Sequence, residues 1–210
     1  GGVVPGVPYD SSADYLVAAC EASLRRLGTD HLDLFQVHRP DALTHPAEVA
    51  RALEALVTSG KGRAVGVSHY SPAQLAALVA HLHIPLASIQ PEFSPLMLEP
   101  LTDGTLDLAM QRRISVLAWS PMAGGRLGDP GDDERAQRVC AELDGQAQRC
   151  GVSRAVATYA WIMAHPAGII PIVGSQQASR IREAAAAYQV KWTRADYYRV
   201  LVASTGVALP

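Results

Sequence analysis

The run Leu32–Val37 is the feature that most constrains the fold. It is short and mostly apolar, and it ends at once in His38, Arg39 and Pro40. Apolar runs of this length between helical patterns are typical of strands buried on both faces of a sheet. Proline ends such a strand because it donates no backbone hydrogen bond. We therefore expect a strand here, with the His38 side chain at its carboxyl end.

Four later segments repeat this pattern, each ending in polar or aromatic residues. The predicted strands are 32–37, 64–67, 86–89, 114–118 and 169–173. Apolar residues at helical spacing predict helices over 13–27, 47–59, 71–82, 102–113, 132–149, 152–164, 179–187 and 194–203. Alternating strands and helices indicate βα units around a parallel sheet, and hence an α/β fold.

Two parallel architectures compete for this pattern. A doubly wound sheet that binds a dinucleotide carries a GxGxxG turn after its first strand, and no such turn is present. A (β/α)8 barrel instead collects its active site from the carboxyl ends of its strands, as the polar strand ends here suggest. A closed barrel needs eight strands and about 250 residues, whereas we predict about five βα units in 210 residues. Five strands would leave two apolar edges that need cover.

The composition is typical of a globular protein with one sizeable core. The chain is 49% hydrophobic and 18% charged, with a formal net charge of -2. A net charge this close to zero gives no sign of electrostatic binding to nucleic acid or to an anionic membrane. No apolar run reaches the roughly 20 residues of a membrane span. Three cysteines without a CxxC spacing favour reduced thiols in a cytoplasmic protein. The histidines share no spacing of metal ligands, so we predict no metal site.

Several runs resemble the aldo-keto reductase superfamily, and its bacterial NADP-dependent oxidoreductases in particular. They are residues 23–34 (SLRRLGTDHLDL), 37–40 (VHRP), 60–68 (GKGRAVGVS) and 118–121 (AWSP). The resemblance extends from about Tyr9 to the C-terminus. It implies a (β/α)8 TIM barrel that binds NADPH and reduces aldehydes and ketones. It also implies that residues 1–210 form the C-terminal two-thirds of one barrel domain, strands four to eight. The family's catalytic Asp, Tyr and Lys would then lie outside this chain.

The resemblance implies that His38 is the catalytic histidine. A neutral imidazole there would orient the substrate carbonyl and donate to the developing oxyanion. The alternative is a strand-end histidine bonded to backbone. Ser68 and Gln90 are implied to bind the nicotinamide carboxamide, for which a glutamine supplies both a donor and an acceptor. His69 stands where the family usually has asparagine, and either a second acid/base role or simple packing is open for it.

The resemblance assigns the cofactor's middle portion to the strand end at 118–121 and the turn that follows. Trp119 is implied to stack on the nicotinamide, with a plain core tryptophan as the alternative. Ser120 and Gly124 lie in a turn whose glycines would let backbone N–H groups approach a pyrophosphate, and Arg126 would help to neutralise it.

The last predicted strand is followed by a further cofactor segment. Gly174 and Ser175 follow the strand, and Ser175 and Arg180 resemble the family's clamp for the 2′-phosphate of NADP. Glu183 is implied to bind adenine, although the next residue is Ala184 where the family has asparagine. The alternative is an ordinary amphipathic helix with a surface arginine.

These observations leave two classes of function open. The first is an NADPH-dependent carbonyl reductase with a small-molecule carbonyl substrate, monomeric if the remaining strands exist. The second is a truncated homologue without redox activity, either a binding or scaffold protein or a catalyst of non-redox acid/base chemistry through His38. Such a homologue would need a partner or a swapped dimer to cover its sheet edges.

Overall fold

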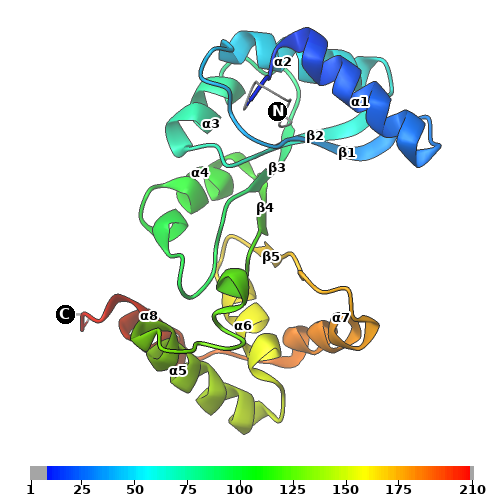
Figure 1. Ribbon diagram of the computed structural model, residues 1–210. Helices are drawn as coiled ribbons and strands as arrows, with labels where there is room; N and C mark the ends of the chain where they lie inside the picture. Colours follow the sequence, from blue (N-terminus) through cyan, green and yellow to red (C-terminus); the bar gives the residue numbers. More distant parts are fainter. Residues whose placement is uncertain (1–8, 209–210) are drawn as a thin grey trace. The chain divides into compact units, whose positions relative to one another are not determined.

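The computed structural model describes residues 9–208, along which helices and strands alternate (Figure 1). The α-helices are α1 Ala13–Leu27, α2 Pro46–Thr58, α3 Pro72–Val79, α4 Thr105–Arg112, α5 Glu134–Cys150, α6 Arg154–Met163, α7 Ala178–Ala184 and α8 Arg194–Thr205. The strands are β1 Leu32–Val37, β2 Gly62–Ser68, β3 Leu86–Gln90, β4 Ser115–Ala118 and β5 Ile170–Pro171. Three short 3-10 helices complete the elements, η1 Glu99–Leu101, η2 Ala123–Gly125 and η3 Ala185–Gln189.

Within residues 9–208 the five strands are all parallel and are hydrogen-bonded in chain order, β1 to β5. The prediction of an α/β fold with about five βα units around a parallel sheet is thereby confirmed. The chain divides into two compact units. Of the described residues, the first unit contains 9–91 and 103–116, and the second contains 92–102 and 117–208.

Strand β4 contributes to both units. Its first half pairs with β3, through Ser115 and Val116, in the first unit. Its second half pairs with β5 in the second unit. The predicted strand 169–173 is reduced to two residues in β5 because Pro171 has no N–H for the ladder.

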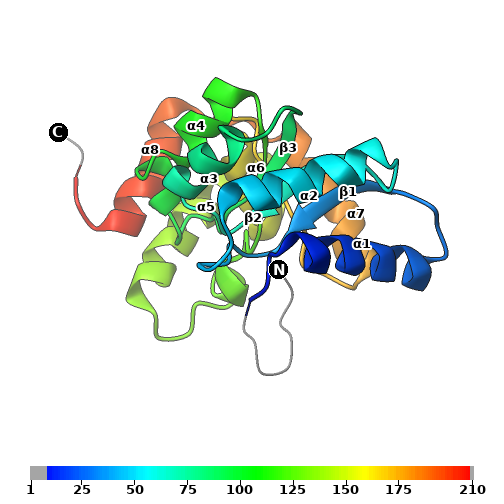
Figure 2. The ribbon, with the colours of Figure 1, turned by 90° about the horizontal axis from the view of Figure 1, so that it is seen from above.

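The first unit packs α1 and α2 against β1 and β2 (Figures 1 and 2). Helix α1 has the predicted bounds, because its signals are local. The Ser12 side chain accepts a hydrogen bond from the N–H of Tyr15, and Gly28 closes the helix at a φ of 65°. Cys20 is fully buried in the core between the helices, where it packs with Leu56 of α2.

The second unit is built on a stack of aromatic rings. Trp161 of α6 is 0% exposed and lies between Phe93 and Tyr197, with ring centroids 5.8 and 4.6 Å away. Its indole Nε1 donates to the Tyr197 carbonyl oxygen at 3.2 Å. Helices α5 and α8 lie side by side (Figure 1). The stack fixes α6, whose first turn contributes to the site described below.

Across residues 9–208 no helix combines the length and the apolar character needed to cross a bilayer.

Candidate functional site

Polar residues follow three neighbouring strands of the first unit where these strands end. His38 comes directly after β1, Ser68 ends β2 and is followed by His69, and Gln90 ends β3. Ser68 and Gln90 are register partners. The first unit therefore brings together His38, Ser68 and Gln90 at the carboxyl ends of adjacent parallel strands, as the sequence predicts.

His69 has a backbone φ of 59°, in the left-handed region that non-glycine residues seldom adopt. Its Nδ1 lies 2.8 Å from Ser68 Oγ and 3.1 Å from the carbonyl oxygen of His38. The Ser68 hydroxyl donates its own hydrogen to the Gln90 carbonyl oxygen at 2.9 Å. Since a carbonyl only accepts, Nδ1 must carry the hydrogen in both of its contacts. The neutral His69 ring is therefore the Nδ1–H tautomer, and it ties the end of β2 to the first residue after β1.

The rings of His38 and His69 meet edge to face, with centroids 5.4 Å apart. Burial lowers the pKa of His69, and the positive charges of Arg39 and His38 act in the same direction, while the hydrogen bond to the His38 carbonyl opposes them. His69 is therefore held neutral at pH 7 beside an exposed His38. This geometry favours a supporting role for His69 over a role as a second acid.

Gln90 belongs to a chain of side-chain hydrogen bonds that the sequence analysis missed. The Ser88 hydroxyl donates to Gln36 Oε1 at 2.6 Å, and Gln36 Nε2 donates to Gln90 Oε1 at 2.7 Å. The side-chain oxygen Oε1 of Gln90 therefore already accepts a hydrogen bond from Gln36. The NH2 group of the same side-chain amide remains as a donor. The polar Gln36, one residue before the buried Val37 in a mostly apolar strand, was the available signal.

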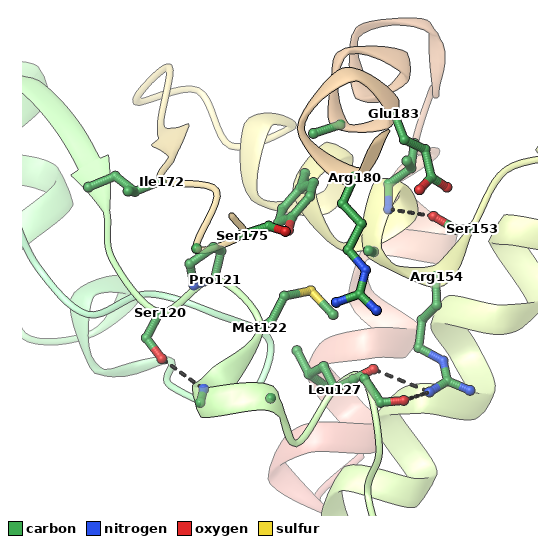
Figure 3. Close-up of a pocket in the computed structure, with 18 of the residues that line it drawn as sticks. Ser120, Pro121, Met122, Leu127, Ser153, Arg154, Ile172, Ser175, Arg180 and Glu183 are labelled. Atoms are coloured by element: carbon green, nitrogen blue, oxygen red, sulfur yellow. Dashed lines mark hydrogen bonds between the residues drawn. The ribbon is translucent and has the colours of Figure 1, made fainter. Parts of the chain in front are cut away.

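The second unit contains a cavity of about 940 Å³, within the usual range for a bound small molecule or cofactor. Its walls come from the turn after β4, the first turns of α6, the segment after β5, and α7 (Figure 3). The lining residues are Ser120, Pro121, Met122, Gly124, Gly125, Leu127, Gly128, Asp129, Ser153, Arg154, Ala155, Val156, Tyr159, Ile172, Gly174, Ser175, Arg180, Glu183 and Ala184.

Six residues predicted to bind the cofactor line this cavity. They are Ser120, Gly124, Gly174, Ser175, Arg180 and Glu183. Figure 3 shows the Arg180 side chain reaching from α7 into the cavity toward Met122. Among residues 9–208, no hydrogen bond or ion pair engages its guanidinium group. Arg180 therefore offers an uncompensated, planar set of donors to an anion in the cavity.

The glycine-rich turn plays a different part from the predicted one. Ser120 Oγ accepts from the N–H of Gly124 at 2.9 Å, and the N–H groups of Gly125 and Gly128 donate to carbonyl oxygens of the turn at 3.0 and 2.8 Å. The N–H groups on which the predicted pyrophosphate contact depends are thus occupied within the turn. Positive φ angles at Gly124 (67°) and Gly125 (98°) explain the glycines instead. Gly124 therefore lines the cavity, and its N–H donates within the turn instead of to a ligand.

Two predicted cofactor residues of the second unit do not line the cavity. Arg126 NH1 lies 3.4 Å from Asp133 Oδ2, and its Nε donates to the Ala123 carbonyl oxygen. Its charge is therefore already paired at the start of α5. Trp119 is partly buried beside the chain segment that begins at Glu92, to which it is joined by a β-bridge. The lining begins one residue later, at Ser120.

The helix that carries Arg180 is shorter than predicted. Helix α7 has seven residues, Ala178–Ala184, instead of the predicted span 179–187, and then tightens into η3. So short a helix adds little dipole, and no side chain caps its first turn. Ser175 Oγ accepts from the N–H of Gln177 at 3.2 Å. Arg180, rather than the helix end, is the feature that suits a phosphate.

Arg154 and Tyr159 of α6 line the cavity and were not predicted. Burial raises the pKa of Tyr159, and the nearby Glu183 carboxylate adds to the shift, so its hydroxyl stays protonated. Arg154 stands at the first position of a helix, where a cation is unfavourable with the helix dipole. An arginine at this unfavourable position indicates that its guanidinium is stabilised by a partner elsewhere in the protein.

The cavity residues fit a phosphorylated nucleotide cofactor. Arg180 supplies a guanidinium that no described residue pairs with. Hydroxyl groups come from Ser120, Ser175 and Tyr159, and the volume suits a ligand of that size. No group of three or more His, Cys, Asp or Glu side chains that could hold a metal occurs within residues 9–208.

Comparison with known proteins decides the family. The model of the Aldo/keto reductase family matches residues 2–201. The chain belongs to this family. It is therefore an oxidoreductase that acts on carbonyl groups, and the predicted non-redox alternative is not favoured. The narrower prediction, that the chain holds only strands four to eight and lacks an N-terminal third, is not borne out by this match over nearly the whole chain.

Individual relatives agree with the family. The chain is 54% identical over 210 residues to 6-dehydroglucose reductase of Novosphingobium aromaticivorans, with 100% of this chain and 69% of that protein covered. It is 39% identical over 201 residues to 6-dehydroglucose reductase of Agrobacterium fabrum, covering 94% and 65%. The fold resembles a crystal structure of the thermostable aldo-keto reductase Tm1743 with the inhibitor epalrestat (TM-score 0.82, 22% identity, 91% and 67% covered). The chain thus spans about two thirds of the length of these relatives.

Proposed function

We propose that the chain reduces a carbonyl compound with NADPH, whose 2′-phosphate end is bound in the cavity of the second unit. The observation that carries this proposal is the Arg180 guanidinium in a cavity of about 940 Å³, where no residue in the described range 9–208 pairs with it. A guanidinium binds phosphate through two parallel, charge-assisted hydrogen bonds, and NADH has no phosphate at this position. Ser175 would join Arg180 at the 2′-phosphate, and Glu183 would bind adenine, since both residues line the same cavity.

The nicotinamide end is assigned to the residues at the strand ends, as the family resemblance suggests. When bound, the cofactor supplies a hydride to the carbonyl carbon. Gln90, with Oε1 already accepting from Gln36, would donate its amide NH2 to the carboxamide oxygen. Ser68 Oγ, whose hydrogen is donated to the Gln90 carbonyl oxygen, would accept from the carboxamide NH2, and Trp119 would offer a stacking surface. His38 would donate from its ring to the carbonyl oxygen of the substrate, which orients it and stabilises the charge that develops there.

For the substrate we propose a sugar-like carbonyl compound. Two relatives, 54% and 39% identical to the chain, are named 6-dehydroglucose reductase. Hydroxyl-rich substrates require polar groups at the reacting end of a site, and the exposed His38 side chain meets that need. Turnover of 6-dehydroglucose compared with an apolar aldehyde of similar size tests this part of the proposal.

The domain organisation is part of the proposal. We propose that the five parallel strands belong to one barrel domain of the family, and the chain spans about two thirds of its relatives' length. We further propose a monomer in the cytoplasm, which agrees with the free thiols of Cys20, Cys140 and Cys150. An intact mass well above 22.3 kDa would support the barrel assignment, and sedimentation would test the monomer.

The cofactor proposal is tested by titrating NADPH and NADH against wild type, Arg180→Ala and Arg182→Ala. Arg182 lies on the same helix, is exposed, and does not line the cavity, so it is a matched control. We expect Arg180→Ala to weaken NADPH binding by about 10- to 100-fold and NADH binding little, since a charge-assisted pair contributes roughly 1.5–3 kcal/mol. Arg182→Ala should change neither. Equal losses for both nucleotides, or no binding by the wild type, would overturn the proposal.

A further inference from the structure

Arg154 makes four hydrogen bonds to parts of the second unit that are distant in sequence. Its Nε and NH2 donate to the two carboxylate oxygens of Asp144 in α5, at 2.7 and 2.6 Å. Its NH1 donates to the carbonyl oxygens of Leu127 and Gly128, each at 3.2 Å (Figure 3). One guanidinium group therefore joins α5, the start of α6 and the end of the glycine-rich turn.

The turn that Arg154 holds is a wall of the cavity, and it adopts a backbone conformation that needs support. Four residues of the turn have positive φ: Ser120, and then the consecutive residues Ala123, Gly124 and Gly125. Two of them are not glycine, so the conformation is strained. The backbone N–H groups of residues 123–128 all donate locally, to residues three to five positions earlier in the sequence. Local bonds move with the turn, whereas the bonds from Arg154 fix it to α5 and α6.

The charge of Arg154 is compensated within the protein. Asp144 engages it with two parallel bonds, and these bonds raise the pKa of Arg154 above its usual value. Arg180, in the same cavity, has no such partner among the described residues. Both arginines line the cavity, but only the charge of Arg154 is compensated by a carboxylate within the described residues.

We propose that Arg154, anchored by Asp144, is a positioning residue that holds the turn Ser120–Gly128 in the conformation that receives the cofactor. The inference rests on the proposed function, which assigns the cavity to NADPH. Arg154 acts through the carbonyl oxygens of Leu127 and Gly128 and makes no contact with the anion. Arg180 alone of the two arginines binds the phosphate.

The test uses Arg154→Lys, Asp144→Asn and, as control, Arg135→Lys. Lysine keeps the positive charge but cannot form a bidentate bond to Asp144 and reach two carbonyl groups as well. The control residue Arg135 lies in α5, as Asp144 does. It donates to Ser204 Oγ at 2.9 Å and does not line the cavity. Two readouts are needed: amide hydrogen exchange without cofactor, and the KM for NADPH together with kcat.

We expect exchange at the amides of Leu127, Gly128 and Asp129 to accelerate about tenfold in Arg154→Lys, with the β2 amides unchanged. The KM for NADPH should rise about tenfold, with kcat within a factor of two. Asp144→Asn should shift both readouts in the same direction, and Arg135→Lys should shift neither.

The sign of the Asp144→Asn effect separates this proposal from direct anion binding. If Arg154 bound the phosphate itself, removing its carboxylate partner would strengthen NADPH binding, and Arg154→Lys would keep most of the affinity. Either result, or unchanged exchange in the turn, overturns the positioning role. A different outcome would overturn the proposed function instead. In that outcome the wild type does not bind NADPH, while hydrogen exchange in the turn of the variants responds as expected. The part of this role that concerns the cofactor would then also be lost.

Discussion

The Ser88 hydroxyl donates to Gln36 Oε1 at 2.6 Å across a strand that lies between them. Ser88 is on β3 and Gln36 is on β1, and both are register partners of Gly66 in the central strand β2. The bond is possible only because position 66 has no side chain. A Cβ there would lie 2.1 Å from Ser88 Oγ and 2.9 Å from the Ser88 carbonyl oxygen. The chain of bonds that reaches Gln90 therefore depends on this glycine.

We expect Gly66→Ala to destabilise the protein by about 1–3 kcal/mol, as overpacking in a core does. Gly62→Ala is the matched control, because it lies on the same strand and a Cβ there would meet nothing closer than 3.8 Å. Urea unfolding of both variants measures the difference. Equal stability of the two would contradict the close contact at Gly66.

His69 makes stability depend on pH in a defined direction. Its pKa in the folded state lies below the ordinary value of 6.5, so the unfolded chain takes up the proton first as the pH falls. The free energy of unfolding should therefore decrease from about pH 6.5 downward. His69→Asn should remove this part of the decrease, since asparagine tolerates a φ of 59° and places an amide N–H donor near the position of Nδ1.

Unfolding of wild type, His69→Asn and His83→Asn at pH 7.5 and 5.5 checks this expectation. His83 is on the surface of the same unit, with 88% of its side chain exposed, and its replacement should leave the wild-type pH dependence largely in place. A drop that persists in His69→Asn would assign the pH dependence to other groups.

Two tryptophans should respond differently to replacement by phenylalanine. Trp161 is fully buried, stacked on Tyr197, and its Nε1 is hydrogen-bonded, so Trp161→Phe should cost about 2 kcal/mol or more. Trp192 is partly buried, and its buried Nε1 has no partner within the described residues. Trp192→Phe removes an unsatisfied donor and should cost less than about 1 kcal/mol. Thermal unfolding of the two variants should rank them in this order.

The three thiols should differ in reactivity. Cys20 and Cys140 are buried, and burial raises the pKa of both, whereas Cys150 at the end of α5 is exposed. A thiol-specific reagent should therefore label one cysteine per chain quickly under native conditions and all three after unfolding. Peptide mapping should find the first label on Cys150, and Cys150→Ser should abolish the fast phase.

Local signals in the sequence account for the elements that were predicted well. Helix α1 begins and ends as expected because a serine cap and a left-handed glycine mark its ends. Strand β5 is shorter than predicted because Pro171 interrupts the ladder, a consequence the apolar run 169–173 concealed. Helix α7 ends early because the alanines after Glu183 continue as a 3-10 turn.

The site was predictable where its residues follow strands, and much less so elsewhere. Ser120, Ser175 and Arg180 stand in the two segments after β4 and β5, where a parallel sheet gathers ligand-binding residues. Tyr159 and Arg154 come from α6, whose sequence indicates only a core helix. Their position in the cavity depends on how α6 packs, and spacing along the chain does not encode that.

The brevity of β5 leaves few hydrogen bonds to hold the cavity-lining segment that follows it. Only two residues of β5 pair with β4, and Ile172 adds one further bond, from its N–H to the Ala118 carbonyl oxygen at 2.9 Å. Beyond these few links the chain continues directly into Gly174 and Ser175. Local opening at this rim should therefore cost far less free energy than global unfolding. Of the two cavity walls that follow strands, the one at 120–128 is tied to α5 and α6 by Arg154, and the one at Gly174 and Ser175 is held by few hydrogen bonds.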